Sequence, residues 1–215
     1  MNASKYSFPD YENFSKFRQD LHKIPELGYE EFETKKYILN YLTNLGIFNK
    51  GAKLTEVQKT GFFIDLQGKG PKTGEKQSII AYRTDLDGLP ITEETGASYS
   101  SIHPNRQHAC GHDGHMTIIV AFLEFYANNI EKVPENVSLR FIFQPAEEGL
   151  SGADIMIEGK CLENVDEIYG LHNVTLFKVG EIGLIEGTIM SRVDKFEINI
   201  HGKGGKKFCF NNFII

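Results

Sequence analysis

Val137-Ser138-Leu139-Arg140-Phe141-Ile142-Phe143 is the stretch that decides the fold, an apolar run that ends at Gln144-Pro145. Its length and its content of β-branched and aromatic residues predict a buried strand. A helix is predicted before it, from Gly114 to about Asn129, because apolar residues recur there at helical spacing. A helix that leads into a buried strand indicates an α/β protein.

The same alternation of helices and strands extends in both directions along the chain. Further helices are predicted from Phe14 to Ile24, from about Glu30 to Leu45 and from Ala153 to Gly159, and further strands at Phe62–Leu66, Ser78–Tyr82 and Asp166–Leu171. We therefore expect an α/β fold, a three-layer αβα sandwich with a mostly parallel sheet. In such sheets the chemistry lies beyond the carboxyl ends of the strands.

Composition excludes several classes of function. The 215 residues are 40% hydrophobic and carry a formal net charge of −6, without a stripe rich in Lys and Arg, which argues against nucleic-acid binding. No apolar run approaches the length of a membrane span, and the first twelve residues lack the apolar core of a signal peptide, so we expect a cytoplasmic protein. Three cysteines, an odd number, give no disulfide framework.

Potential metal ligands are concentrated between His108 and His115, where three histidines, a cysteine and an aspartate occur within eight residues. Thiolate and imidazole suit zinc, while imidazole and carboxylate also suit manganese, cobalt or nickel. We predict Cys110 and His112 as ligands. The remaining two histidines are interpreted as support for the ligands or as helix caps, with direct metal binding as the alternative.

Three further candidates each follow a predicted strand: Asp85, the pair Glu147-Glu148, and His172. One glutamate of the pair can bind a metal while the other acts as a base towards water. A carboxylate at Asp85 can orient a metal-bound imidazole. The alternatives are a solvated acidic face for the pair, a turn at Asp85 and a structural role for His172.

These motifs, in this order, resemble the metal-dependent N-acyl-amino-acid amidohydrolases, the group of hippurate hydrolase, auxin-conjugate hydrolase and N-acetyl-diaminopimelate deacetylase. The resemblance runs through Arg18–Gly28, Arg83–Ile91, His108–His115, Phe143–Gly149 and Gly170–Asn173 and reaches Phe196–Gly205. It implies a zinc-peptidase-like fold and hydrolysis of the amide bond of a small N-acyl amino acid.

The resemblance also implies roles for individual residues. Cys110, His112, Glu148 and His172 match positions that hold two divalent metal ions, either manganese, zinc or nickel. Glu147 matches the general base, which takes a proton from the attacking water and passes it to the departing amine. Asp85 matches an acidic residue of the active site.

The last residues depart from this family. We expect residues 1–187 to form the catalytic domain, and 188–205 to begin a lid domain whose first strand contains Phe196, Ile198 and Ile200. Residues 206–215 are interpreted as an unrelated tail produced by a frameshift. The chain is then an incomplete, inactive fragment that cannot dimerise through the lid, with an active minimal hydrolase or a non-catalytic binding module as alternatives.

Overall fold

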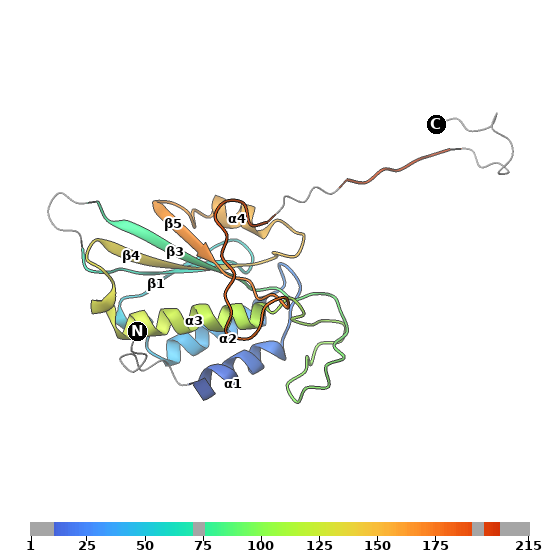
Figure 1. Cartoon of the computed structure of the whole chain (residues 1–215), viewed down its shortest axis with the longest axis horizontal. Helices are drawn as coiled ribbons and strands as arrows, with labels where there is room; N and C mark the ends of the chain where they lie inside the picture. Colours follow the sequence, from blue (N-terminus) through green and yellow to red (C-terminus); the bar gives the residue numbers. More distant parts are fainter. Residues whose placement is uncertain (1–10, 71–75, 191–195, 203–215) are drawn as a thin grey trace. The chain divides into compact units, whose positions relative to one another are not determined.

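The computed structural model describes residues 11–70, 76–190 and 196–202. By compactness the chain divides into two units, Met1–Asn173 and Val174–Ile215. All the helices and strands of the described residues belong to the first unit (Figure 1). The boundary predicted near residue 187 stays a prediction, and the tail at 206–215 lies outside the described residues.

Helices and strands alternate along the first unit. Its helices are α1 (Tyr11–His22), α2 (Phe32–Asn44), α3 (His112–Asn128) and α4 (Gly152–Glu158), and its strands are β1 (Lys53–Glu56), β2 (Phe62–Leu66), β3 (Ser78–Asp85), β4 (Val137–Gln144) and β5 (Val165–Gly170). Two short 3-10 turns lie at Phe48–Lys50 and Ile130–Lys132. All eight helices and strands predicted between Phe14 and Leu171 are present, most of them within two or three residues of the predicted bounds.

The sheet is mixed, which corrects the expectation of a mostly parallel one. Its strand order is β1-β2-β4-β3-β5. β3 runs parallel to β4 and β5, whereas β2 runs antiparallel to β1 and β4. β1 and β2 are antiparallel because a short turn joins them, and tight turns connect only antiparallel strands. β1 escaped prediction because all four of its residues are exposed and show no apolar alternation.

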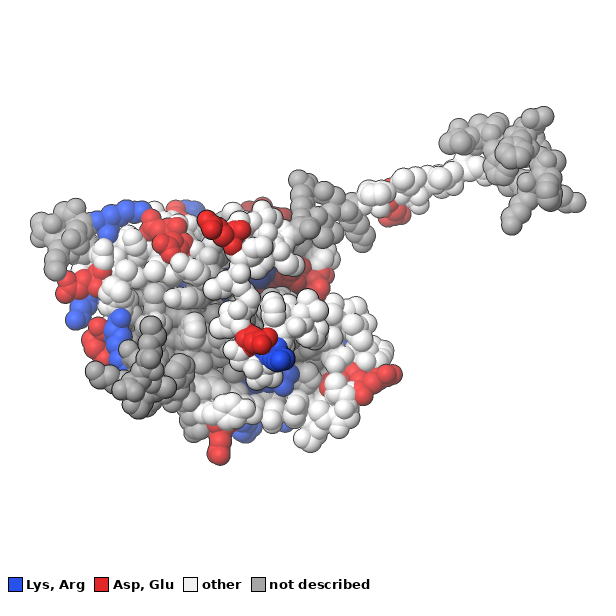
Figure 2. Space-filling view, viewed as in Figure 1, with Lys and Arg blue, Asp and Glu red and all other residues white. Residues whose placement is uncertain are grey.

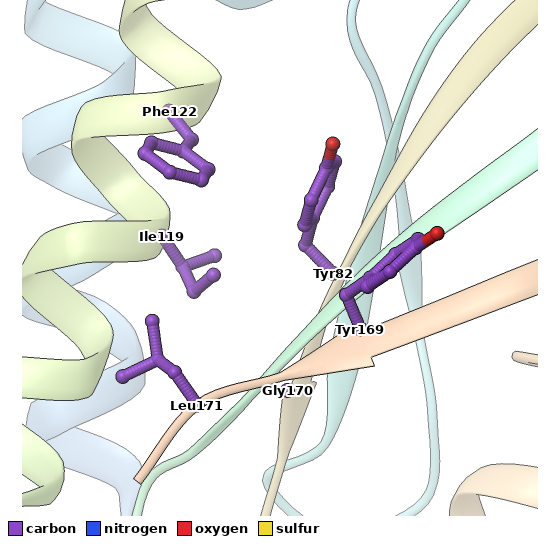
Figure 3. Close-up of a pocket in the computed structure, with 6 residues that line it drawn as sticks. All are labelled: Tyr82, Ile119, Phe122, Tyr169, Gly170 and Leu171. Carbon is purple, nitrogen blue, oxygen red and sulfur yellow. The ribbon is translucent and has the colours of Figure 1, made fainter. Parts of the chain in front are cut away.

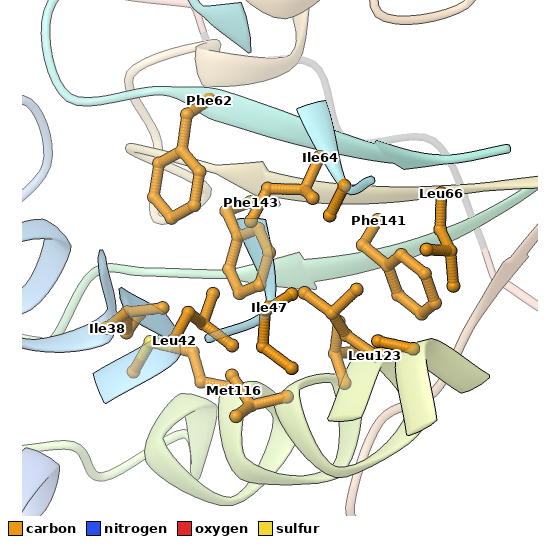
Figure 4. Packing of buried hydrophobic residues seen from close by; sticks show 14 of the residues in the cluster. Ile38, Leu42, Ile47, Phe62, Ile64, Leu66, Met116, Leu123, Phe141 and Phe143 are labelled. Atoms are coloured by element: carbon orange, nitrogen blue, oxygen red, sulfur yellow. The ribbon is translucent and has the colours of Figure 1, made fainter. Parts of the chain in front are cut away.

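Two apolar cores cover the two faces of the sheet, which confirms the αβα sandwich. Helices α1, α2 and α3 lie on one side of the sheet and α4 lies on the other (Figure 1). Since side chains alternate along a strand, Phe62 and Phe143 point into the larger core, where their rings stack with centroids 4.4 Å apart (Figure 4). Their neighbours Phe63 and Ile142 point into the smaller core beneath α4.

The second unit contains no helix or strand among its described residues. The predicted strand containing Phe196, Ile198 and Ile200 is therefore wrong for the described residues 196–202, and these side chains are largely exposed. Alternation alone does not make a strand, which needs a neighbour to accept and donate its main-chain hydrogen bonds. Among the described residues, no helix is long and apolar enough to cross a membrane.

Candidate metal centre

Polar side chains from three strand ends and one helix start converge on His112. The parallel strands β3, β4 and β5 end at the same edge of the sheet, and α3 begins there. The potential ligand atoms form three groups, each within 4.8 Å: Cys110, His112 and His172; His112, Glu147 and Glu148; and Asp85, His112 and His115. The residues predicted as ligands and as base are thus brought together.

His112 is the common member of these groups and is fully buried. Its Nδ1 donates a hydrogen bond to the main-chain carbonyl of Asp87, 2.8 Å away. Its Nε2 has no hydrogen-bond partner among the described residues and faces three carboxylates: Glu148 at 3.9 Å, and Asp85 and Glu147 at 4.0 Å. Because a carbonyl only accepts, the neutral imidazole carries its proton on Nδ1 and keeps a free lone pair on Nε2.

His172 repeats this arrangement at the end of β5. Its Nδ1 donates to the carbonyl of Asn173 at 2.7 Å, and its Nε2 lies 3.5 Å from the sulfur of Cys110. Burial and then the nearby Glu148 raise the pKa of the Cys110 thiol to about 12. A thiol surrounded by carboxylates holds its proton, and a cation placed among them would favour the thiolate.

Asp85 and Asp87 have different surroundings, and only Asp87 lies behind the imidazole. Burial raises the pKa of Asp85 to about 6 against the opposing effect of the Arg83 guanidinium, with which it pairs. Asp85 is on the Nε2 side of His112, so it faces the centre instead of orienting the ring from behind. Orientation belongs to Asp87, whose carboxylate also accepts the main-chain N–H of Glu148 at 3.0 Å.

Asp87 is the site residue that the sequence did not single out. Two aspartates separated by one residue directly after a strand are the signal that could have found it. Burial alone would lower the pKa of His112, but Asp87 and then Asp85 outweigh it and raise it. The buried imidazole thus lies in a strongly negative environment.

His108 and His115 are both buried, and their supporting role stays a prediction, because His115 also belongs to one of the three groups of potential ligand atoms. The main-chain N–H of Asn173 donates to Nε2 of His115 at 3.0 Å, and burial lowers the pKa of His115 to about 4. The same asparagine covers Gly111, where an added Cβ would lie 2.5 Å from its side-chain oxygen. His108 is buried, and burial lowers its pKa to about 4 as well. Both imidazoles are therefore neutral at pH 7.

A buried ionic network lies on the far side of the start of α3. Asp113 forms an ion pair with Arg18, whose Nε lies 2.7 Å away, and accepts a hydrogen bond from His22 Nδ1 at 2.8 Å. The other ring nitrogen of His22 lies 3.2 Å from Glu93. The bond to Asp113 raises the pKa of His22 although burial opposes it. This network ties α1 to α3 beside the candidate ligands.

The residues present fit a divalent metal ion. The set offers a thiol, imidazole nitrogens and carboxylate oxygens, the donors that zinc and manganese prefer. His112 Nε2 and one carboxylate oxygen of Glu148 are buried without a hydrogen-bond partner among the described residues, which is unusual for buried polar atoms unless a ligand or ion serves them. Elsewhere, acidic and basic residues are interspersed on the face shown in Figure 2.

An apolar pocket of about 190 Å³ lies beside the centre, between α3 and the ends of β3 and β5. Its walls are Tyr82, Ile119, Phe122, Tyr169, Gly170 and Leu171 (Figure 3). None of these side chains is a thiol, imidazole or carboxylate like those around His112. The pocket lies next to the centre because Leu171 directly precedes His172 in the sequence. The reactive groups and the apolar pocket are therefore adjacent but separate.

Comparisons with known proteins agree with this geometry. N-acetyldiaminopimelate deacetylase of Geobacillus sp. (strain WCH70) is 43% identical over 196 residues, which cover 89% of this chain and 48% of that protein. The Listeria monocytogenes serotype 4a protein of the same name is 41% identical over 196 residues, 89% of this chain and 49% of the relative. The chain spans about half the length of the curated relatives it matches.

Solved structures give the same result. The Bacillus subtilis YXEP protein, described as a dinuclear metal binding peptidase of the M20 family, superposes with a TM-score of 0.72 at 35% identity over 82% of this chain and 47% of that one. A putative aminohydrolase from methicillin-resistant Staphylococcus aureus gives 0.65 at 33% identity, covering 75% and 39%. The model of peptidase family M20/M25/M40 matches residues 81–212, more than half of the sequence, and the chain therefore belongs to that family.

Proposed function

We propose that the chain carries the metal centre of an amidohydrolase that cleaves the amide bond of N-acyl amino acids, with N-acetyl-diaminopimelate as the first substrate to test. The observation that carries the proposal is the convergence of thiol, imidazole and carboxylate groups on the unpartnered Nε2 of the buried His112. The named relatives, which are deacetylases, support the choice of an acetyl group.

In this proposal Cys110, His112, Glu148 and His172 hold two divalent ions, manganese, zinc or nickel, as the dinuclear relative suggests. Divalent ions held by these residues would supply polarisation of the amide carbonyl and a lowered pKa for water. The protein holds the imidazoles for this task by main-chain carbonyls, which leave each Nε2 free to bind.

Glu147 is the proposed general base. Its carboxylate lies 4.0 Å from His112 Nε2, and its side chain is more exposed than those of Asp85 and His112, so it borders both the centre and the solvent. It can take a proton from the attacking water and deliver it to the departing amine. Asp85, held by Arg83, adds negative charge on the same side of His112.

The test begins with metal alone. Titration of the chain with Co²⁺ under reducing conditions should give d–d absorption and a thiolate-to-metal band in the near ultraviolet, because Cys110 would be a ligand. The variant Cys110→Ser should lose the thiolate band, and His112→Ala should bind far more weakly. An absence of any Co²⁺ binding by the intact, folded chain would contradict the proposal.

Hydrolysis is measured next, by release of diaminopimelate from its N-acetyl derivative in the presence of Mn²⁺ or Zn²⁺. Turnover that disappears in Glu147→Gln, while Co²⁺ binding persists, supports the proposed base. Metal binding without turnover agrees with the expected inactive fragment and leaves the centre itself supported. Turnover that is unaffected in Glu147→Gln would exclude Glu147 as the base.

A further inference from the structure

The loop after β4, residues 145–149, has an unusual backbone. Ala146 adopts a left-handed conformation with φ of 49°, which is uncommon for residues other than glycine and is retained where the surroundings enforce it. The next two residues are Glu147 and Glu148, so this conformation sets the direction in which both carboxylates leave the main chain. Something in the fold must hold Ala146 in place.

Two buried carboxylates accept the main-chain N–H groups on either side of Glu147. Asp87 accepts from Glu148, as described above, and Glu31 accepts from Ala146 at 2.8 Å. The second oxygen of Glu31 accepts a hydrogen bond from the hydroxyl of Thr60, in the turn between β1 and β2. One carboxylate thus joins the α1–α2 connection, the β1–β2 turn and the loop after β4.

Capping of the helix that follows does not explain the burial of Glu31. It occupies the N-cap position of α2 but makes no side-chain capping bond. Glu26 bonds the first turn of α2 instead, accepting from both the main-chain N–H and the hydroxyl of Thr34. Glu31 is fully buried, and burial raises its pKa although Thr60 and main-chain donors oppose the change. Its described donors from distant segments are the hydroxyl of Thr60 and the main-chain N–H of Ala146.

The packing around Ala146 supports the same conclusion. A Cβ added to Gly28, in the connection that also carries Glu31, would lie 2.8 Å from the Cβ of Ala146. On the opposite side, a Cβ added to Gly152 would lie 1.7 Å from the carbonyl oxygen of Pro145. Pro145 and Ala146 are therefore enclosed, and Glu31 accepts the hydrogen bond of the Ala146 N–H.

We propose that Glu31 is a positioning residue, whose carboxylate holds Ala146 in its left-handed conformation and so aims Glu147 and Glu148 at the candidate metal centre. This proposal rests on the proposed function, because the direction of these two carboxylates matters only if they act at the metal centre. Glu31 does not touch the metal or the substrate in this proposal, and it acts through the main chain.

The experiment measures Co²⁺ binding by the full chain, using titration calorimetry and the visible spectrum. Loss of a group that supports a ligand typically weakens metal binding by roughly 10- to 100-fold, and we expect this for Glu31→Ala, with an altered d–d spectrum. Glu31→Gln should bind like wild type, because its carbonyl can accept from Ala146 and its amino group can donate to Thr60.

Glu26→Ala is the matched control. It removes the other buried carboxylate of the same connection, which bonds Thr34 and no described residue of the loop after β4. Its Co²⁺ affinity and spectrum should equal those of wild type. A folded Glu31→Ala that binds Co²⁺ as tightly as wild type would overturn the proposal, and so would an equal loss in Glu26→Ala or in Glu31→Gln. If Glu31→Ala does not fold, Glu31→Asp, which is one methylene too short, takes its place with the same expectations.

A second measurement separates this proposal from the proposed function. If wild type binds no Co²⁺, the proposed function fails, and amide hydrogen exchange decides the role of Glu31 without metal. In Glu31→Ala the amides of residues 146–149 should then exchange faster, while those of β4 and α3 stay protected. Unchanged exchange at Ala146 would overturn the positioning role.

Discussion

Replacing Arg140 by methionine should lower the free energy of unfolding by about 3 kcal/mol. Arg140 lies in β4 with only 9% of its side chain exposed, and it forms a two-point ion pair with Asp65 on β2 at 2.7 and 3.1 Å. Its Nη1 also donates to main-chain carbonyls of the turn between α4 and β5, at 2.9 Å to Cys161 and 3.1 Å to Glu163.

The magnitude follows from these contacts. Hydrogen bonds to charged groups contribute roughly 1.5–3 kcal/mol each, and breaking a buried ion pair costs about 3–5 kcal/mol. We take the lower end, because 32% of the Asp65 side chain is exposed and water can replace part of the lost pairing. With an m-value of about 2 kcal/mol/M, the urea midpoint should fall by about 1.5 M.

The assay is equilibrium unfolding in urea, followed by circular dichroism, of wild type, Arg140→Met and Arg140→Lys. Lysine keeps the charge but not the two-point geometry, so its effect should be intermediate. Lys160→Met removes an exposed cation from the same turn and should change stability by less than about 0.5 kcal/mol. A loss below about 1 kcal/mol for Arg140→Met would refute the reasoning that the guanidinium fastens this turn to the sheet.

Three other predictions follow from the fold and the centre. His22→Asn should destabilise the chain more at pH 6 than at pH 8.5, because the pKa of His22 is raised in the folded state. Such a group gives stability that is complete below its unfolded pKa of about 6.5 and is lost as pH rises through its folded pKa. Urea unfolding at both pH values checks this, and a loss of stability that does not depend on pH would contradict it. Phe143→Ala should cost about 3–5 kcal/mol, since its buried ring stacks on Phe62, whereas Phe122→Ala at a partly exposed position should cost much less in the same assay. Co²⁺ at about 100 times its Kd should raise the free energy of unfolding by about 2.7 kcal/mol. EDTA should remove this effect, and His112→Ala should not show it. Equal thermal melting temperatures with and without metal would argue against a metal centre formed by the folded state.

The elements that pack into the apolar cores were predictable from the sequence. The strand β2 was predicted at its observed bounds and β4 within one residue, because their apolar runs are buried on both faces of the sheet. β1 was missed, since its exposed side chains carry no burial pattern, and α1 begins at Tyr11, before the first apolar residue that the pattern counted. The antiparallel pairing of β1 with β2 depends on turn geometry, which apolar periodicity does not encode.

The candidate centre was predictable to the extent that its residues follow strands. Cys110, His112, Glu147, Glu148 and His172 lie together as the order of the motifs indicated, while their roles as ligands and base stay predictions.

The residues that hold this centre in place were not predictable. Glu31 and Ala146 are separated by 115 positions, and Arg140 and Asp65 by 75. In the sequence, a glutamate between two helices that will be buried cannot be distinguished from one exposed to solvent. Only the folded chain brings the distant hydrogen-bond donor to its carboxylate. Long-range pairing of this kind leaves no local pattern in the sequence.

The hydrogen bond from His112 to the main-chain carbonyl of Asp87 has a consequence for how such a centre tolerates mutation. Every amino acid has this carbonyl, so no substitution at position 87 deletes the acceptor that fixes the proton on Nδ1. Selection on the side chain at that position can act only through its own contacts, chiefly the one to Glu148. Substitutions at position 87 therefore leave the hydrogen bond that orients the imidazole in place, whereas they can change the direction of the Glu147-Glu148 pair.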